Sequence, residues 1–365
     1  MTMRADAVII GGGHNGLVCA FYLARAGLKV RVLERRPVVG GAAVTEEFHP
    51  GFRNSTASYT VSLLRPQVIA DMRLHERGLR VVEREVGNFL PFADSYLTMG
   101  GAPGRTQAEF ARISPRDAEA YPRYDAMLEK VAAVLRDMAL KAPPEVGGGI
   151  AALIAAARQG WPLAKLGIEA QRDLLAIFTL SAREFLEPWF EDDRIRAAFA
   201  FDAVVGNFAG VSTPGSAYVL LHHVFGEVNG KPGVWGHAIG GMGDVGRAMA
   251  EACTEAGVEI ALESPVERVL VDGGKAAGVR LESGEEIAAG IVAANVGPAL
   301  LYRRMIDGHE LPEDFRRRIA GFKAGSGTLR MNVALAELPD FTVLPGKARA
   351  GHRTAGIVIA PGMDY

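Results

Sequence analysis

The hydrophobic pattern at the start of the chain predicts a strand, a turn, a helix and a second strand. Asp6–Ile10 is a short apolar run that ends at three glycines, as expected for a buried strand before a turn. Leu17–Ala26 has apolar residues at helical spacing, and Gly27 follows it as a helix terminator. Val30–Leu33 is a second apolar run. This order is the beginning of an α/β fold with a parallel sheet.

The middle of the chain is predicted to be rich in helices. Ser114 and Pro115 mark a helix start, with serine as N-cap and proline at the first helical position, and Pro143-Pro144 ends that helix. Two short strands are expected before it and three helices after it: Leu79–Val82, Tyr96–Thr98, Ala151–Arg158, Gln171–Leu186 and Arg194–Phe201.

The glycine run Gly240–Gly246 introduces the last part of the chain. It precedes a helix predicted from Val245 to about Ala256 and is similar to a second phosphate turn. However, Lys231–His237 is a poor parallel strand, so we interpret the run as a helix entry in the first nucleotide-binding domain, not as a nicotinamide site. Four strands are predicted after this helix: Val258–Leu262, Val266–Val271, Ala277–Leu281 and Ile287–Ala294.

The residues between the first strand and the first helix are those of a dinucleotide site. Gly11 permits a tight turn, Gly13 lets the backbone approach a pyrophosphate, and Gly16 lets the helix pack close to the strand. The free N–H groups of the helix N-terminus then face the phosphates. Glu34 ends the second strand, where a carboxylate accepts hydrogen bonds from a ribose hydroxyl. An ordinary glycine-rich turn would not require this acid.

A second glycine pair indicates which dinucleotide is bound. Gly40 and Gly41 lie where flavoproteins of the glutathione reductase type bring the backbone against the cofactor again, with a simple loop turn as the alternative. Arg35 and Arg36 could instead meet the 2′-phosphate of NADP, but Glu34 would repel that phosphate. The sequence therefore predicts FAD.

These motifs resemble those of the phytoene desaturase-like FAD-dependent oxidoreductases, closest to the group that contains pyridine nucleotide-disulfide oxidoreductase domain-containing protein 2. The matching segments are Ile9–Leu17, Leu33–Arg36, Gly40–Glu46, Leu220–Val224, Trp235–Gly243 and Ala293–Pro298. By resemblance, FAD is lined by Gly11, Gly13, His14, Asn15, Gly16, Glu34, Arg35, Gly40, Gly41, Ala42 and the backbone of Val266. The sequence identifies no catalytic residue.

Two departures from the family pattern limit what the resemblance implies. Ala42 stands where many amine oxidases and desaturases carry arginine, which weakens a specific claim of either activity. Family members also have a further glycine-containing segment that meets the flavin ring, and the chain reaches Tyr365 without one. We therefore expect a C-terminally truncated chain with an incomplete flavin site.

The expected architecture is α/β, with a doubly wound FAD-binding domain of the glutathione reductase (Rossmann) type and an inserted, helix-rich α+β substrate domain. The FAD-binding domain is expected over residues 1–93 and 229–300, and the substrate domain over residues 94–228 and 301–365.

Composition and charge narrow the possible partners. The chain has 365 residues, is 49% hydrophobic and has a net charge of −2, which gives no reason to expect nucleic acid as a partner. Val146–Ala157 is the most apolar stretch and is too short to span a bilayer. It is predicted as a helix packed on its neighbours, with peripheral membrane contact as the alternative. No signal peptide is visible and cysteine is scarce, so we expect a cytoplasmic protein.

The remaining candidates for chemistry are few. Cys19 and Cys253 are far apart in sequence and are predicted as core residues, not a redox pair. Tyr59 is a candidate for orienting a substrate, with a packed tyrosine as the alternative. His222 and His223 are adjacent, which does not suit shared metal ligation, so no metal is expected.

The predicted function is FAD-dependent hydride transfer between flavin N5 and a small apolar organic substrate, which the resemblance narrows to a carotenoid- or isoprenoid-like molecule. A flavin amine oxidase is one alternative. The other is a non-catalytic, FAD- or lipid-binding protein of the regulatory or escort kind, because a fold alone does not determine function. The oligomeric state is not indicated.

Overall fold

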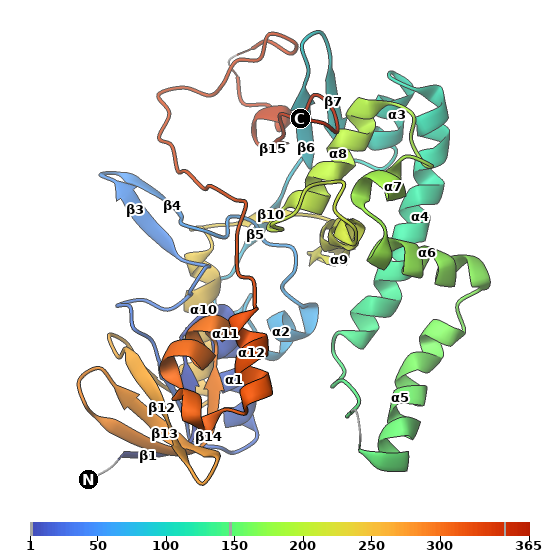
Figure 1. Ribbon diagram of the computed structural model, residues 1–365. Helices are drawn as coiled ribbons and strands as arrows, with labels where there is room; N and C mark the ends of the chain where they lie inside the picture. The colour runs from blue at the N-terminus through green and yellow to red at the C-terminus, as the bar shows by residue number, and fades with distance from the viewer. Residues whose placement is uncertain (1–2, 146–147, 347) are drawn as a thin grey trace. The chain divides into compact units, whose positions relative to one another are not determined.

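The computed structural model describes residues 3–145, 148–346 and 348–365 and divides into two compact units (Figure 1). Unit 1 contains the chain up to Val82, residues 236–325 and residues 330–334, and unit 2 contains residues 83–235, 326–329 and 335–365. Residues 83–93, expected in the FAD-binding domain, lie in unit 2 because their strand pairs with Tyr96–Met99. Residues 301–325, expected in the substrate domain, lie in unit 1, where Met305 packs in the sheet's core.

A six-stranded sheet organises unit 1. Its order is β11 (Glu259–Ala261), β2 (Val30–Leu33), β1 (Met3–Ile10), β14 (Glu286–Ala294), β13 (Lys275–Leu281) and β12 (Val266–Asp272). The first four strands are parallel, while β13 and β12 are antiparallel additions. The predicted α/β class is confirmed.

Both faces of this sheet are covered, which explains why β1 is continuously apolar. Ala7 and Ile9 pack in one core, and Val8 and Ile10 in another. The first core includes the buried faces of helices α1 (His14–Arg25) and α10 (Gly243–Glu255). The other elements of unit 1 are β3 (Thr45–His49), β4 (Phe52–Ser55), α2 (Pro66–Asp71), β10 (Gly236–Ala238), α11 (Pro298–Leu300), the π-helical turn η2 (Leu301–Met305), the 3₁₀ turn η3 (Gly308–Glu310) and α12 (Glu313–Ala320).

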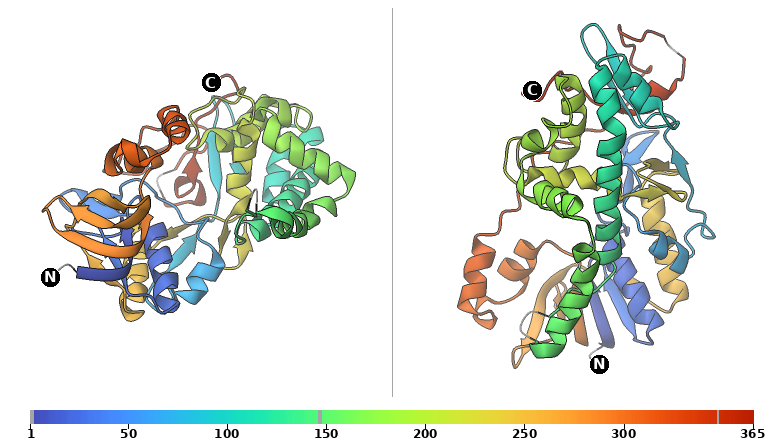
Figure 2. Two further views of the ribbon diagram at one scale, coloured as in Figure 1. Left: turned by 60° about the horizontal axis from the view of Figure 1, so that its bottom comes forward. Right: turned by 90° about the vertical axis from the view of Figure 1, so that its right-hand side faces the viewer.

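Unit 2 is mainly helical, and the longest of its described helices is α4 (teal in Figure 2, right). Its helices are α3 (Arg105–Ala111), α4 (Pro115–Met138), α5 (Gly149–Ala164), α6 (Ile168–Thr179), α7 (Ala182–Leu186), α8 (Asp193–Val204), the 3₁₀ turns η1 (Ser216–Leu220) and η4 (Gly351–Arg353), and α9 (Leu221–Phe225). Its strands are β6 (Asn88–Pro91), β7 (Tyr96–Met99), β8 (Glu227–Val228), β9 (Lys231–Pro232) and β15 (Gly356–Ile357), while β5 (Val81–Glu83) crosses the boundary between the units. Phe110, Tyr124, Phe190 and Phe199 form the aromatic centre of its core.

Two helix predictions differ from the structure. The single helix predicted over Gln171–Leu186 is wrong, because Leu180 is extended and Ser181 starts a new helix through a capping box with Glu184. The apolar helix after Pro144 is present as α5, although residues 146–147 of the predicted stretch lie outside the described residues. It contacts α4, and Ala152, Ala156 and Leu163 are half-buried, so the expected packing on a neighbouring helix is present. None of its residues is fully buried, and its opposite face is exposed. No described helix is both long and apolar enough to cross a membrane.

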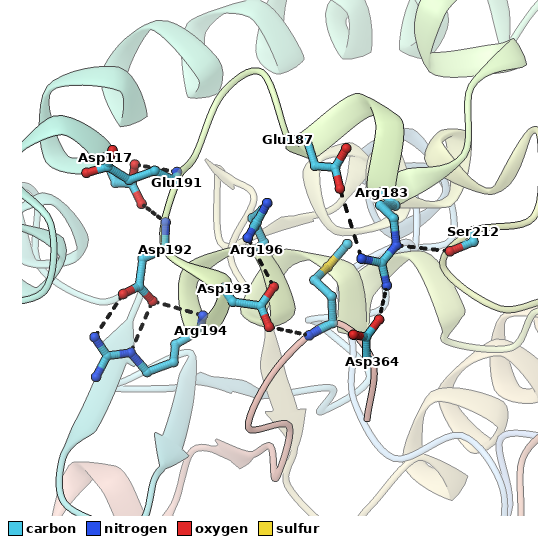
Figure 3. A network of polar contacts seen from close by, with 11 residues as sticks. Asp117, Arg183, Glu187, Glu191, Asp192, Asp193, Arg194, Arg196, Ser212 and Asp364 are labelled. Carbon is cyan, nitrogen blue, oxygen red and sulfur yellow. Dashed lines mark hydrogen bonds and ion pairs between the residues drawn. The ribbon is translucent and has the colours of Figure 1, made fainter.

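A buried carboxylate connects α4 to the segment before α8 through hydrogen bonds (Figure 3). Asp117 is fully buried, and its two oxygens accept hydrogen bonds from the backbone N–H groups of Glu191 at 2.8 Å and Asp192 at 3.0 Å. Ser114 caps α4 by accepting from the Asp117 N–H, and its hydroxyl donates to the Glu191 carboxylate. One side chain thus connects two segments that are far apart in the sequence.

Asp202 on α8 is expected to make the stability of the protein depend on pH. Its carboxyl Oδ1 is shielded from solvent, and burial raises the pKa of this carboxyl well above its usual value. The stabilising contribution of the protonated group is therefore complete below the ordinary carboxyl pKa and is lost as the pH rises through the raised pKa.

We expect Asp202→Asn to flatten this pH dependence, since asparagine keeps the shape without ionising. The free energy of unfolding, measured by urea denaturation from about pH 5 to about pH 8, should fall more steeply in the wild type, by up to about 1.4 kcal/mol per pH unit. Burial also raises the pKa of Asp125, so part of the slope should persist in the variant. If the free energy of unfolding fell equally steeply with pH in the two proteins, Asp202 would not be the source of this pH dependence.

Candidate functional site

The two glycine motifs meet beyond the C-terminal end of β1. Gly13 and Gly40 form an isolated parallel bridge, and the Gly40 N–H donates to the Gly12 carbonyl at 2.8 Å. A Cβ added to Gly41 would lie 3.0 Å from the Gly13 Cα. The backbone of the second motif therefore lies directly against the first, an approach that side chains at these positions would prevent.

The first glycine turn fits the roles predicted from its spacing. Gly11 has a φ of 96°, which favours glycine. A Cβ at Gly16 would lie 2.2 Å from the Gly11 carbonyl oxygen, so only glycine allows α1 to start this close to the strand. Gly13 has an ordinary φ of −69°, and its requirement for glycine is therefore one of space.

Glu34 lies beside this turn in a buried position. Its Oε2 accepts from the Gly12 N–H at 2.7 Å, and its Oε1 accepts from the Arg36 N–H at 3.0 Å. A carboxylate has about four lone-pair directions, so these two bonds leave capacity for ribose hydroxyls. The same carboxylate thus supports the turn and offers acceptors to a nucleotide.

The start of α1 has unused hydrogen-bonding groups. The helix has no side-chain cap, so the N–H groups of its first turn have no acceptor from the helix itself. His14 Nδ1 is buried with no hydrogen-bond partner among the described residues, and burial lowers the pKa of this imidazole. Asn15 is exposed beside it. This arrangement fits a pyrophosphate, whose oxygens would accept from these groups.

The other predicted FAD residues surround the turn less closely. Arg35 is exposed, and it is Arg36 that pairs with Glu46 and donates its backbone N–H to Glu34. Ala42 is exposed, next to the glycine pair. Val266 begins β12, two residues after Ser264, whose N–H donates to the Glu34 carbonyl at 2.9 Å.

Asn295 belongs to this site but was not predicted as one of its residues. Its N–H donates to the Ile10 carbonyl at 2.8 Å, and its Nδ2 lies 2.7 Å from the position of a Gly13 Cβ. The carboxamide therefore supports the glycine turn from the end of β14. The only sequence signal was its place in the matching segment Ala293–Pro298, because its role requires β14 to lie beside β1.

The glycine run Gly240–Gly246 allows close packing between elements of unit 1. A Cβ at Gly246 would lie 3.0 Å from the Gly40 Cα, so α10 lies directly on the second glycine pair. The N–H groups of Met242 and Gly243 donate to the hydroxyls of Ser55 and Thr45. Because these N–H groups at the start of α10 already have acceptors, the run agrees with the predicted helix entry and does not offer a second phosphate turn.

The remaining candidates do not form a second reactive site. Cys253 is buried, donates to the Leu17 carbonyl at 3.1 Å, and has its pKa raised to about 12 by burial. Cys19 is half-buried, and burial raises its pKa too, so the prediction of two core cysteines is confirmed. Tyr59 is half exposed and stacks on the Arg330 guanidinium at 4.6 Å. Among the described residues, no three His, Cys, Asp or Glu side chains are grouped to hold a metal.

A parallel sheet with two joined glycine motifs and an acid at the end of the second strand defines a dinucleotide-binding domain of the flavoprotein type. The chain belongs to the family described as flavin containing amine oxidoreductase, which matches residues 16–329. The predictions of FAD as cofactor and of the FAD-dependent oxidoreductase fold are confirmed by this match.

Individual relatives support the same family. Pyridine nucleotide-disulfide oxidoreductase domain-containing protein 2 of Rattus norvegicus is 36% identical over 356 residues, which cover 93% of this chain and 61% of the relative. The neurosporene-forming phytoene desaturase of Rhodobacter capsulatus is 29% identical over 318 residues, covering 82% of this chain and 54% of the relative. The resemblance inferred from the motifs is confirmed, and the chain spans about three fifths of the rat protein's length.

Solved structures show the same fold. Putrescine oxidase bound to putrescine is 22% identical, with a TM-score of 0.56 over 88% of this chain and 64% of that protein. An oxidoreductase from Methanosarcina mazei gives a TM-score of 0.54 at 18% identity, over 87% of this chain and 64% of that protein. At these identities the likeness concerns the fold alone.

Proposed function

We propose that this protein is an FAD-dependent oxidoreductase that transfers a hydride between a small apolar organic substrate and the flavin, with carotenoid- or isoprenoid-like molecules as the substrate class. The main supporting observation is the close approach of Gly41 and Asn295 to Gly13, beside the buried carboxylate of Glu34. The similarity to a phytoene desaturase over 82% of this chain supports the substrate class.

The residues of unit 1 would bind and orient the cofactor. The first turn of α1 would donate to the pyrophosphate, and Glu34 would accept from the ribose. His14, with its lowered pKa, would remain a neutral hydrogen-bonding group near neutral pH. When bound, FAD supplies hydride acceptance at N5, so the protein needs no nucleophile for this chemistry.

Anaerobic reduction of the bound flavin tests the substrate class. We expect an isoprenoid polyene to bleach the visible flavin band of the purified protein, whereas putrescine should not, because the proposed site selects an apolar molecule. Chemical reduction with dithionite would verify that the flavin is competent. Bleaching by the amine alone would indicate an amine oxidase, and a competent flavin reduced by neither compound would contradict the proposed substrate class.

A further inference from the structure

Helix α5 presents an apolar surface to solvent within unit 2. Ile150, Leu153 and Trp161 are 79%, 71% and 59% exposed, and Ile154 is 49% exposed. Side chains of this size are normally buried, and several of them together on one helix mark an interaction surface.

The exposed apolar residues share one face of the helix. Their spacing, from Ile150 through Leu153 and Ile154 to Trp161, follows the helical repeat. Ala152, Ala156 and Leu163 are half-buried and lie on the other side. The helix contacts α4 and extends beyond it in the views of Figures 1 and 2. The exposed fractions of Ile150 and Trp161 show that their face is in contact with solvent.

The charged side chains on this helix and at its C-terminal end are basic. Residues 148–168 contain no aspartate or glutamate, although the whole chain has a net charge of −2. Arg158 and Lys165 are exposed at the border of the face, and neither makes an ion pair among the described residues. The Lys165 ammonium lies 5.6 Å from the centre of the Trp161 ring. Apolar side chains, an aromatic ring and unpaired cations are the composition of helices that lie in a membrane interface.

We propose that α5 docks on the surface of an anionic lipid bilayer, with Ile150, Leu153 and Trp161 among the acyl chains and Arg158 and Lys165 at the headgroups. Its 16 residues extend over about 24 Å, less than the roughly 30 Å of a hydrocarbon core, so the helix lies in the plane of the membrane. A second copy of the chain fits less well, because a twofold pairing of this face would bring the like charges of Arg158 and Lys165 together.

Vesicle flotation of the purified, flavin-containing chain tests this proposal. We expect the chain to float with vesicles of phosphatidylcholine and phosphatidylglycerol, and more weakly with phosphatidylcholine alone. Leu153→Glu and Trp161→Glu should each lower the partition coefficient by roughly tenfold or more, because each removes buried apolar area and adds a repelled charge. Arg158→Ala and Lys165→Ala should each lower it about fivefold on the anionic vesicles only.

The matched control is Phe208→Glu. Phe208 is 74% exposed in unit 2 but lies outside α5, so the same chemical change should leave flotation unchanged. Circular dichroism and flavin content verify that each variant is folded. The proposal is overturned if the wild type floats with neither vesicle, or if Leu153→Glu floats as well as the wild type. It is also overturned if α5 variants abolish self-association measured without lipid, which would assign the face to a second copy.

Discussion

Gly13→Val is expected to yield a folded protein without FAD. The φ of −69° at this position is available to valine, so the backbone has no conformational reason to change. The new Cβ would lie 2.7 Å from Asn295 Nδ2, and the methyl groups would fill the space predicted for the pyrophosphate. The flavin-to-protein absorbance ratio after purification should fall to background, while the far-ultraviolet circular dichroism stays that of the wild type.

Variants at two other glycines distinguish a specific loss of FAD binding from a general loss of folding. Gly210 has no atom within 4 Å of an added Cβ and an ordinary φ, so Gly210→Val should keep its flavin. Gly16→Ala should lower both flavin content and stability, since its Cβ would lie 2.2 Å from the Gly11 carbonyl oxygen, a backbone atom that cannot rotate away. A Gly13→Val protein with the flavin content of the wild type would show that the pyrophosphate does not lie at this turn.

Asp117→Ala is expected to lower the free energy of unfolding by roughly 2–4 kcal/mol, because two backbone donors lose their acceptor and a cavity remains. The affected N–H groups are those of Glu191 and Asp192, at the entry to α8 (Figure 3). The carboxylate also lies in the first turn of α4, where a negative charge is favourable. Urea denaturation followed by circular dichroism measures the change.

The neighbouring ion pair provides the control. Arg116 pairs with Glu191 at 2.8 Å, but both side chains are about half exposed or more, so Arg116→Ala should lower the free energy of unfolding far less than Asp117→Ala does. Asp117→Asn keeps one acceptor oxygen and should give an intermediate loss. If Asp117→Ala were as stable as Arg116→Ala, the buried carboxylate would not be what connects α4 to α8.

The amino-acid sequence by itself determined the elements around the nucleotide and the class of cofactor. The strand, glycine turn, helix and second strand depend on near neighbours along the chain, so their spacing predicts β1, α1 and β2 directly. The capping box of Ser181 and Glu184 was equally visible in the sequence, and it explains why the predicted helix from Gln171 to Leu186 is divided. Local signals of this kind need no knowledge of the fold.

Only the tertiary structure decided which distant residues complete the site. The bond from Gly40 to Gly12 and the approach of Gly246 to Gly40 bring three glycine segments together. Asn295 reaches Gly13 because β14 pairs with β1, although hundreds of residues separate them in the sequence. The exposure of α5 was likewise set by which elements surround it, since an apolar helix has the same local pattern whether it is buried or not. Periodicity and spacing describe one segment at a time, whereas strand order and burial depend on contacts between segments.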